Sequence, residues 1–159
     1  MAVRPSPDLI PYDRMREDLF VTPRFDDLQE LVLKDARREF SETTIDFFMH
    51  PRNHGPLEGA DGFGSVSGTC GDTMSIWIKV VDGVIEQATF ITDGCGTSIA
   101  SASMITVLAT GKLLEEAAGL GQNDVLSALG GLPTESEHCA KLASMTLREA
   151  IKDYERRRQ

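Results

Sequence analysis

The sequence is poor in cysteine and in aromatic residues. Its 159 residues include three cysteines, and aromatic residues make up 6% of the chain. An odd number of cysteines excludes a complete set of intrachain disulfides, and so small a number is typical of a reducing compartment. We therefore expect a cytoplasmic protein whose cysteines are free thiols.

Positive charge is also scarce. The chain has 16 Lys and Arg residues against 25 Asp and Glu residues, which gives a net charge of −9. Binding to nucleic acid needs clustered Lys and Arg, and the one basic run, residues 156–158, fits the solvated end of a helix. The charge balance therefore argues against nucleic acid as a partner.

Long hydrophobic runs are absent as well. The most apolar stretch, Ile99–Ala109, is too short to span a bilayer. Residues 1–20 mix acidic and basic side chains without an apolar core, which fits neither a secretory signal nor an acid-poor transit peptide. We therefore expect no membrane partner.

Three regions are predicted along the chain. Residues 1–25 carry several prolines among charges, which predicts an irregular arm. Residues 26–40 have the spacing of an extra helix, and its apolar stripe must be buried against its own domain, another subunit or a partner. The stripe consists of Leu28, Leu31, Val32 and Phe40. Residues 41–159 then form the main domain.

The middle of the main domain predicts a three-stranded antiparallel sheet. Apolar residues alternate with polar ones from Thr73 to Val80, as in a half-buried strand. Asp82-Gly83 favours a tight hairpin turn, after which Val84–Thr92 forms the partner strand. Phe63–Thr69 adds a glycine-rich third strand, and three strands are about the minimum for an independently stable sheet.

Helices are predicted before and after this sheet. Ser41 is the N-cap of a short helix that ends before Pro51, and the later helices cover residues 97–110, 113–118, 124–129 and 137 to about 156. A block of strands followed by a block of helices indicates an α+β fold, with several helices packed on the sheet. The buried side of the last helix is predicted to contain Leu142, Met145, Leu147, Ala150, Ile151 and Tyr154.

Each cysteine lies in a setting that suits a metal-binding thiolate. They occur as Thr69-Cys70-Gly71-Asp72, Gly94-Cys95-Gly96 and Glu137-His138-Cys139-Ala140. Thiolates select zinc, copper(I) and iron–sulfur clusters, and either Asp72 or His138 offers a fourth ligand. All three cysteines fall at the ends of predicted elements, and two of them fall near helix N-termini, which favour a thiolate. For any one of these cysteines taken alone, the competing interpretation is that it is a small buried hydrophobic residue.

The motifs resemble those of the U-type iron–sulfur cluster scaffold family, which comprises IscU and the NifU N-terminal domain. The similarity runs in order from about Ser41 to Tyr154. It rests on Ser41-Glu42-Thr43-Thr44-Ile45-Asp46, Pro51-Arg52-Asn53-His54-Gly55, Cys70-Gly71-Asp72, Gly94-Cys95-Gly96, residues 98–101 and residues 138–143. The resemblance implies an α+β fold with a three-stranded sheet. It also implies cluster assembly on the three cysteines, assisted by Asp72 and His138.

On this hypothesis the protein is a scaffold and carrier rather than an enzyme. It receives sulfur from a cysteine desulfurase, with Cys139 as the persulfide acceptor, binds iron, builds a [2Fe–2S] cluster and transfers it to apo-proteins. Asp72 is a harder ligand than thiolate, so it favours release of the cluster. We expect a monomer or a weak homo-oligomer. Members served by a dedicated Hsp70 carry Leu-Pro-Pro-Val-Lys before the last cysteine, whereas this chain has Leu-Pro-Thr-Glu-Ser at residues 132–136, so that chaperone is not an expected partner.

Two other hypotheses use the same residues. The first is a structural or sulfur-accepting zinc protein, with Cys70, Cys95, Cys139 and either Asp72 or His138 around a tetrahedral ion. The second is a hydrolase in which Cys139 is the nucleophile and a histidine is the base. The chain's histidines are His50, His54 and His138, and the last is adjacent to Cys139, which is poor geometry for a base.

Overall fold

The computed structural model describes residues 24–159, and the chain divides into two compact units, Met1–Asp35 and Ala36–Gln159. Apart from its last two residues, the predicted arm lies outside the described part. Helix α2 (Phe25–Glu39) covers nearly the same residues as the predicted extra helix, with acidic residues in its first turn and basic residues in its last, as the helix dipole favours. No residue of α2 is buried, and burial of its apolar stripe stays a prediction.

The predicted sheet is confirmed, with the order β1-β2-β3 and antiparallel pairing throughout. Its strands are β1 (Gly62–Ser67), β2 (Thr73–Val81) and β3 (Val84–Thr92). Met74, Ile76 and Ile78 of β2 are fully buried, as the alternation requires. The hairpin turn places Asp82 at φ 51° and Gly83 at φ 77°, the left-handed region in which glycine is at no disadvantage.

Five helices of the second unit follow the predicted pattern within two residues at each end. They are α3 (Glu42–Met49), α4 (Gly96–Ala109), α5 (Leu114–Ala118), α6 (Gln122–Leu129) and α7 (Glu137–Arg157). Ser41 is the N-cap of α3, and its hydroxyl accepts a hydrogen bond from the Thr44 N–H at 3.0 Å. One short 3-10 helix, η1 (Thr134–Ser136), was not predicted.

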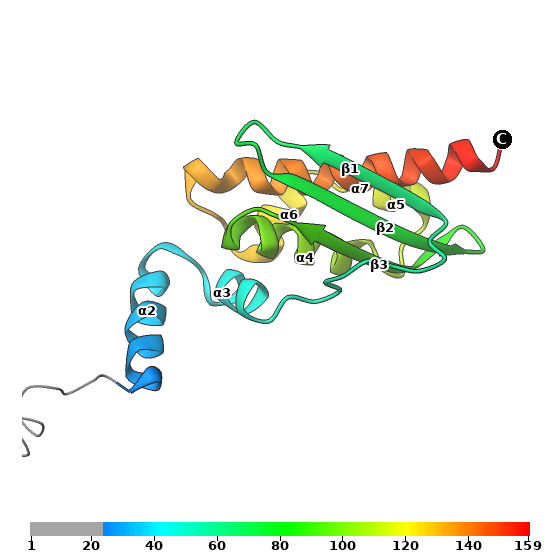
Figure 1. Cartoon of the computed structure of the whole chain (residues 1–159). Helices are drawn as coiled ribbons and strands as arrows, with labels where there is room; N and C mark the ends of the chain where they lie inside the picture. The colour runs from blue at the N-terminus through cyan, green and yellow to red at the C-terminus, as the bar shows by residue number, and fades with distance from the viewer. Residues whose placement is uncertain (1–23) are drawn as a thin grey trace, which may run out of the picture. The chain divides into compact units, whose positions relative to one another are not determined.

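Helices α4 and α7 cover one face of the sheet, as Figure 1 shows, and together with β2 and β3 they form the core. Helix α7 lies so close to β1 that only glycine fits between them. A Cβ atom on Gly64 would lie 2.5 Å from the Ala150 nitrogen and 2.6 Å from the Thr146 oxygen, both in the α7 backbone. This close approach fixes α7 on the sheet.

The predicted buried face of α7 is correct except for Met145. Leu142, Leu147, Ala150, Ile151 and Tyr154 are buried, whereas Met145 is 41% exposed. Met145 precedes Leu147 by two residues, which places the two side chains on nearly opposite sides of a helix. Among the helices of residues 24–159, none is long and apolar enough to cross a membrane.

Candidate metal centre

Four segments that carry the candidate ligands meet at one end of the sheet. The loop between β1 and β2, the end of β3, and the first turns of α4 and α7 all lie there (Figure 1). Because β2 pairs antiparallel with both of its neighbours, β1 and β3 run in the same direction, and their C-terminal ends lie at the same end of the sheet. The predicted convergence of Cys70, Cys95 and Cys139 therefore follows from the topology.

Cys70 and Asp72 lie in a tight loop that begins and ends at the sheet. The Gly68 N–H donates to the Asp72 carbonyl at 2.8 Å, and the Gly71 N–H donates to the Gly68 carbonyl at 3.1 Å. Gly71 adopts φ 84°, a conformation that a residue with a Cβ rarely adopts. The loop leaves the Cys70 side chain exposed at its tip.

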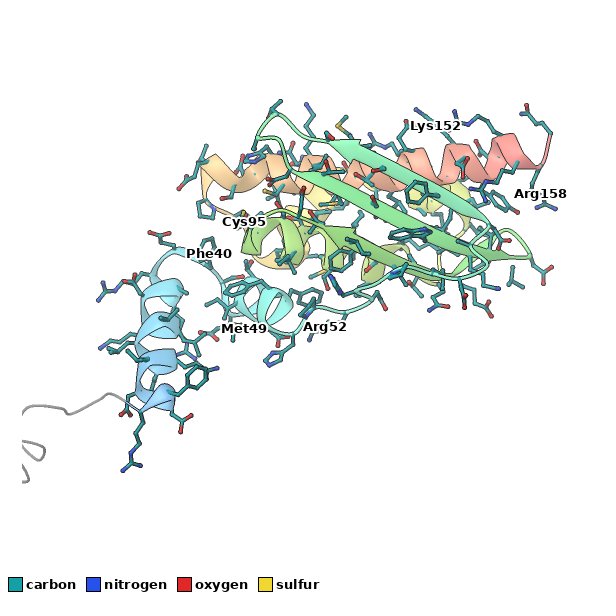
Figure 2. The ribbon with its side chains drawn as sticks, viewed as in Figure 1. Phe40, Met49, Arg52, Cys95, Lys152 and Arg158 are labelled. Carbon is teal, nitrogen blue, oxygen red and sulfur yellow. The ribbon has the colours of Figure 1, made fainter. Side chains whose placement is uncertain are left out.

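Cys95 is the N-cap residue of α4, and its side chain is exposed. Figure 2 shows it at the end of this helix, with Lys152 and Arg158 towards the other end of the molecule's second unit. The backbone N–H of Thr73, next to Asp72, donates to the Asp93 carboxylate at 2.7 Å. This bond ties the loop that carries Cys70 to the turn that carries Cys95.

Cys139 is the buried member of the set. It lies in the first turn of α7 and is 2% exposed. Two hydroxyl groups from the first turn of α4 contact its sulfur, Thr97 Oγ1 at 3.5 Å and Ser98 Oγ at 3.4 Å. The same Thr97 oxygen lies 3.0 Å from the sulfur of Cys95, so this hydroxyl stands between two of the thiols.

His138 connects Cys70 with Cys139. Its Nε2 atom lies 2.6 Å from the Cys70 sulfur and 3.6 Å from the Cys139 sulfur. Ligand atoms on one tetrahedral zinc ion lie about 3.5 Å apart, given bonds of roughly 2.3 Å to sulfur and 2.0 Å to nitrogen. The His138–Cys139 pair therefore already has the spacing of two ligands of one ion, whereas Cys70 and His138 must separate to admit one.

Asp72 is connected to Cys139 through the side chain of Ser98. The Ser98 hydroxyl donates to Asp72 Oδ2 at 3.0 Å, so the carboxylate is linked to Cys139 by one intervening side chain. Across residues 24–159, no three His, Cys, Asp or Glu side chains already surround a single ion-sized position. The candidate donors are thus linked in part through the hydroxyl groups of Thr97 and Ser98, and they would have to move closer together to bind one metal ion.

The two cysteines on either side of Thr97 differ in acidity. Partial burial works to raise the pKa of the Cys95 thiol, but hydrogen bonds from the Thr97 hydroxyl and the backbone N–H groups of Ser98 and Thr97 outweigh it and lower the pKa. Burial raises the pKa of the Cys139 thiol, and hydrogen bonds from the Ser98 and Thr97 hydroxyls offset this rise only in part, while the nearby Cys95 and Asp72 add smaller raising effects. Cys95 is therefore the readier thiolate of the two.

The other histidines lie elsewhere. His50 contacts Asp46 at 3.2 Å, and His54 packs edge-on against Phe90 with ring centroids 5.4 Å apart. Among the chain's three histidines, only His138 contacts Cys139 in the structure. The arrangement offers Cys139 no separate imidazole base, which removes the geometric support for a hydrolase.

Sequence reasoning missed the two hydroxyl residues that contact the sulfurs. Thr97 and Ser98 follow Cys95 by two and three residues, within the first helical turn. Ser and Thr side chains commonly hydrogen-bond to nearby backbone groups, so the sequence alone does not distinguish these two residues from residues that contact a thiol on another helix. Their buried state, at 6% and 0% exposure, is a tertiary property.

Comparison with known proteins decides the family. The pattern of the family described as NifU-like N terminal domain matches residues 39–159. The chain belongs to the NifU-like N terminal domain family. The resemblance and the α+β fold expected from the sequence are thereby confirmed.

Named relatives of this NifU-like chain include two cluster assembly scaffolds. The iron-sulfur cluster assembly scaffold protein IscU 1 of Archaeoglobus fulgidus is 48% identical over 119 residues, which cover 74% of this chain and 78% of that protein. The scaffold protein IscU of Escherichia coli K12 is 42% identical over 125 residues, which cover 76% of this chain and 97% of that protein.

A solved structure shares the fold. The N-terminal part of a NifU-like nitrogen-fixing protein from Brucella abortus superposes with a TM-score of 0.59 and 18% identity, covering 73% of this chain and 94% of that one. At this identity the likeness concerns the arrangement of helices and strands alone.

Proposed function

We propose that this protein is an iron–sulfur cluster assembly scaffold, a carrier that builds a cluster and passes it on rather than an enzyme. The observation that supports this most is the meeting of Cys70, Cys95 and Cys139 with Asp72 and His138 at one end of a NifU-like fold. Soft thiolates and an imidazole suit iron and sulfide, and the carboxylate adds a harder, more exchangeable donor. The family and its named scaffold relatives support the same function.

We propose a cysteine desulfurase as the sulfur donor and Cys139 as the persulfide acceptor. The Cys139 thiolate attacks the outer sulfur of the donor's cysteine persulfide, the sulfur–sulfur bond of the donor breaks, and the donor leaves as a thiolate. Reduction of the transferred sulfur to sulfide takes two electrons, which an electron-transfer protein supplies. Because Cys139 is 2% exposed, the loop at Cys70 or the first turn of α7 must open before the attack.

We propose that the cargo is a [2Fe–2S] cluster bound by Cys70, Cys95, Cys139 and Asp72, with His138 available as an alternative ligand. The recipients are apo iron–sulfur proteins in the cytoplasm. No dedicated Hsp70 is proposed, because residues 134–136 form η1 without the Leu-Pro-Pro-Val-Lys sequence. We place the scaffold in residues 41–159, as a monomer or weak homo-oligomer, and residues 26–40 as an additional helix.

Zinc binding is the second candidate. The 3.6 Å between His138 Nε2 and the Cys139 sulfur matches the spacing of two ligands on a tetrahedral zinc ion. Zinc held this way would be an occupant of the purified protein or the basis of a separate sulfur-accepting role.

Anaerobic reconstitution tests the proposal. The apo-protein is incubated with ferrous iron, cysteine, a reductant and a cysteine desulfurase, and the visible absorption of a thiolate-bound cluster is followed. We expect this absorption in the parent and its loss when Cys70, Cys95 or Cys139 is replaced by Ser. Tight zinc binding with no cluster formation under these conditions would contradict the scaffold function and favour the zinc protein.

A further inference from the structure

Ser98 connects two candidate ligands that come from different parts of the fold. Its side chain is fully buried, and its hydroxyl lies 3.0 Å from Asp72 Oδ2 and 3.4 Å from the Cys139 sulfur. Asp72 belongs to the loop before β2, and Cys139 belongs to α7. One hydroxyl on α4 thus bridges the loop and the helix.

The surroundings of Ser98 are shaped to admit this bridge. Gly94 precedes it by four residues, and a Cβ atom there would lie 2.5 Å from the Ser98 Cβ and 2.8 Å from Asp72 Oδ2. A side chain at position 94 would therefore push the serine and the aspartate apart. By contrast, the hydroxyl of Ser101, one turn later in α4, is buried and has no hydrogen-bond partner.

We propose that Ser98 is a positioning residue of the metal centre, which holds the Asp72 carboxylate beside Cys139 before any metal arrives. The inference rests on the proposed function, because it takes Asp72 and Cys139 as ligands of one site. A carboxylate held by a charge-assisted hydrogen bond keeps one oxygen free to bind metal and does not turn into solvent. Hydrogen-bond partners of this kind commonly change metal affinity by about 10–100-fold.

Cobalt(II) binding to the apo-protein measures this role without cluster formation. Its affinity is determined by competition with a chromophoric chelator, and the sulfur-to-cobalt absorption reports thiolate ligation. We expect Ser98→Ala to bind cobalt about 10–100-fold more weakly. The matched control is Ser101→Ala, the same change in the same buried helix at a hydroxyl without a partner, for which we expect an unchanged affinity.

A double-mutant cycle assigns the effect to Asp72. In the Asp72→Ala background, Ser98→Ala should have no further effect, because the carboxylate that it positions is gone. An equal loss in both backgrounds would overturn the proposal, since Ser98 would then act on Cys139 or on general packing. An affinity of Ser98→Ala equal to that of the parent would overturn it too.

Two further measurements separate a failure of this proposal from a failure to fold and from a failure of the proposed metal centre. If Ser98→Ala does not fold, Ser98→Thr is compared with Ser98→Val, because the two side chains have nearly the same shape and differ in the hydroxyl. Equal cobalt affinities of these two variants would then overturn the proposal. A parent protein without any sulfur-to-cobalt absorption would instead count against the proposed metal centre itself.

Discussion

Replacing Gly64 with Ala should separate α7 from the sheet. The new Cβ would lie 2.5 Å from the Ala150 nitrogen, 2.6 Å from the Thr146 oxygen and 2.9 Å from the Glu149 carbonyl carbon. All three are backbone atoms of one helix, so no single side chain can rotate away. The helix must retreat by about 1 Å to restore ordinary van der Waals distances.

The free energy of unfolding should fall by about 3 kcal/mol, at the upper end of the usual overpacking cost. Two contributions add here, because the displaced helix also loses contact with the buried residues of β2. For a domain of this size the melting temperature should fall by roughly 10 °C.

Thermal and urea melts of the apo-protein test this, with Gly119→Ala as the control. Gly119 has φ −79°, and the nearest atom to a Cβ there lies at an ordinary 3.4 Å, so its replacement should change the stability by less than about 1 kcal/mol. A loss below about 1 kcal/mol for Gly64→Ala would refute the direct backbone packing of α7 on β1.

Three further predictions concern the ligands. Asp72→Ala should lengthen the half-life of a reconstituted cluster in air and slow its transfer to an apo-ferredoxin, because an exchangeable oxygen ligand is lost; faster decay would contradict that role. Zinc at 100 times its dissociation constant should raise the free energy of unfolding of the parent by about 2.7 kcal/mol, whereas the melting temperature of Cys139→Ser should stay nearly unchanged. An equal shift of the melting temperature in both proteins would mean that Cys139 is not a ligand. Because thiolate is the reactive form, the pH profile of alkylation should shift to lower pH for Cys95 and to higher pH for Cys139, in line with their pKa directions. Mass spectrometry after brief iodoacetamide treatment shows which cysteine is alkylated first, and alkylation of Cys139 before Cys95 would contradict the prediction.

The order of helices and strands could be predicted because it follows from local patterns. Alternation along β2, Asp82-Gly83 at the turn and Ser41 at a helix start each act within a few residues. The prediction that Met145 lies in the core is wrong, because it relied on the apolar side chain and ignored that Met145 lies on the side of the helix opposite Leu147. The turn at residues 134–136 has no periodicity to reveal it.

The meeting of the candidate ligands could be predicted from the sequence, whereas their contacts with neighbouring side chains could not. The topology brings the ends of β1 and β3 together, so the convergence of the cysteines was accessible from the sequence. The roles of Thr97 and Ser98 depend on how α4 faces α7, and the burial of Cys139 depends on the same packing. These are properties of the assembled core, which no spacing along the chain encodes.

The unequal burial of the three thiols has a consequence for oxidative damage. When the scaffold carries no cluster, peroxide meets the exposed Cys70 and Cys95 directly, whereas Cys139 is 2% exposed. Sulfenic acid should therefore form first at the two exposed positions, a step that thiol reductants reverse. The sulfur buried in the core is the one whose oxidation would insert polar oxygen among packed side chains, so the fold shields the thiol whose loss would harm it most.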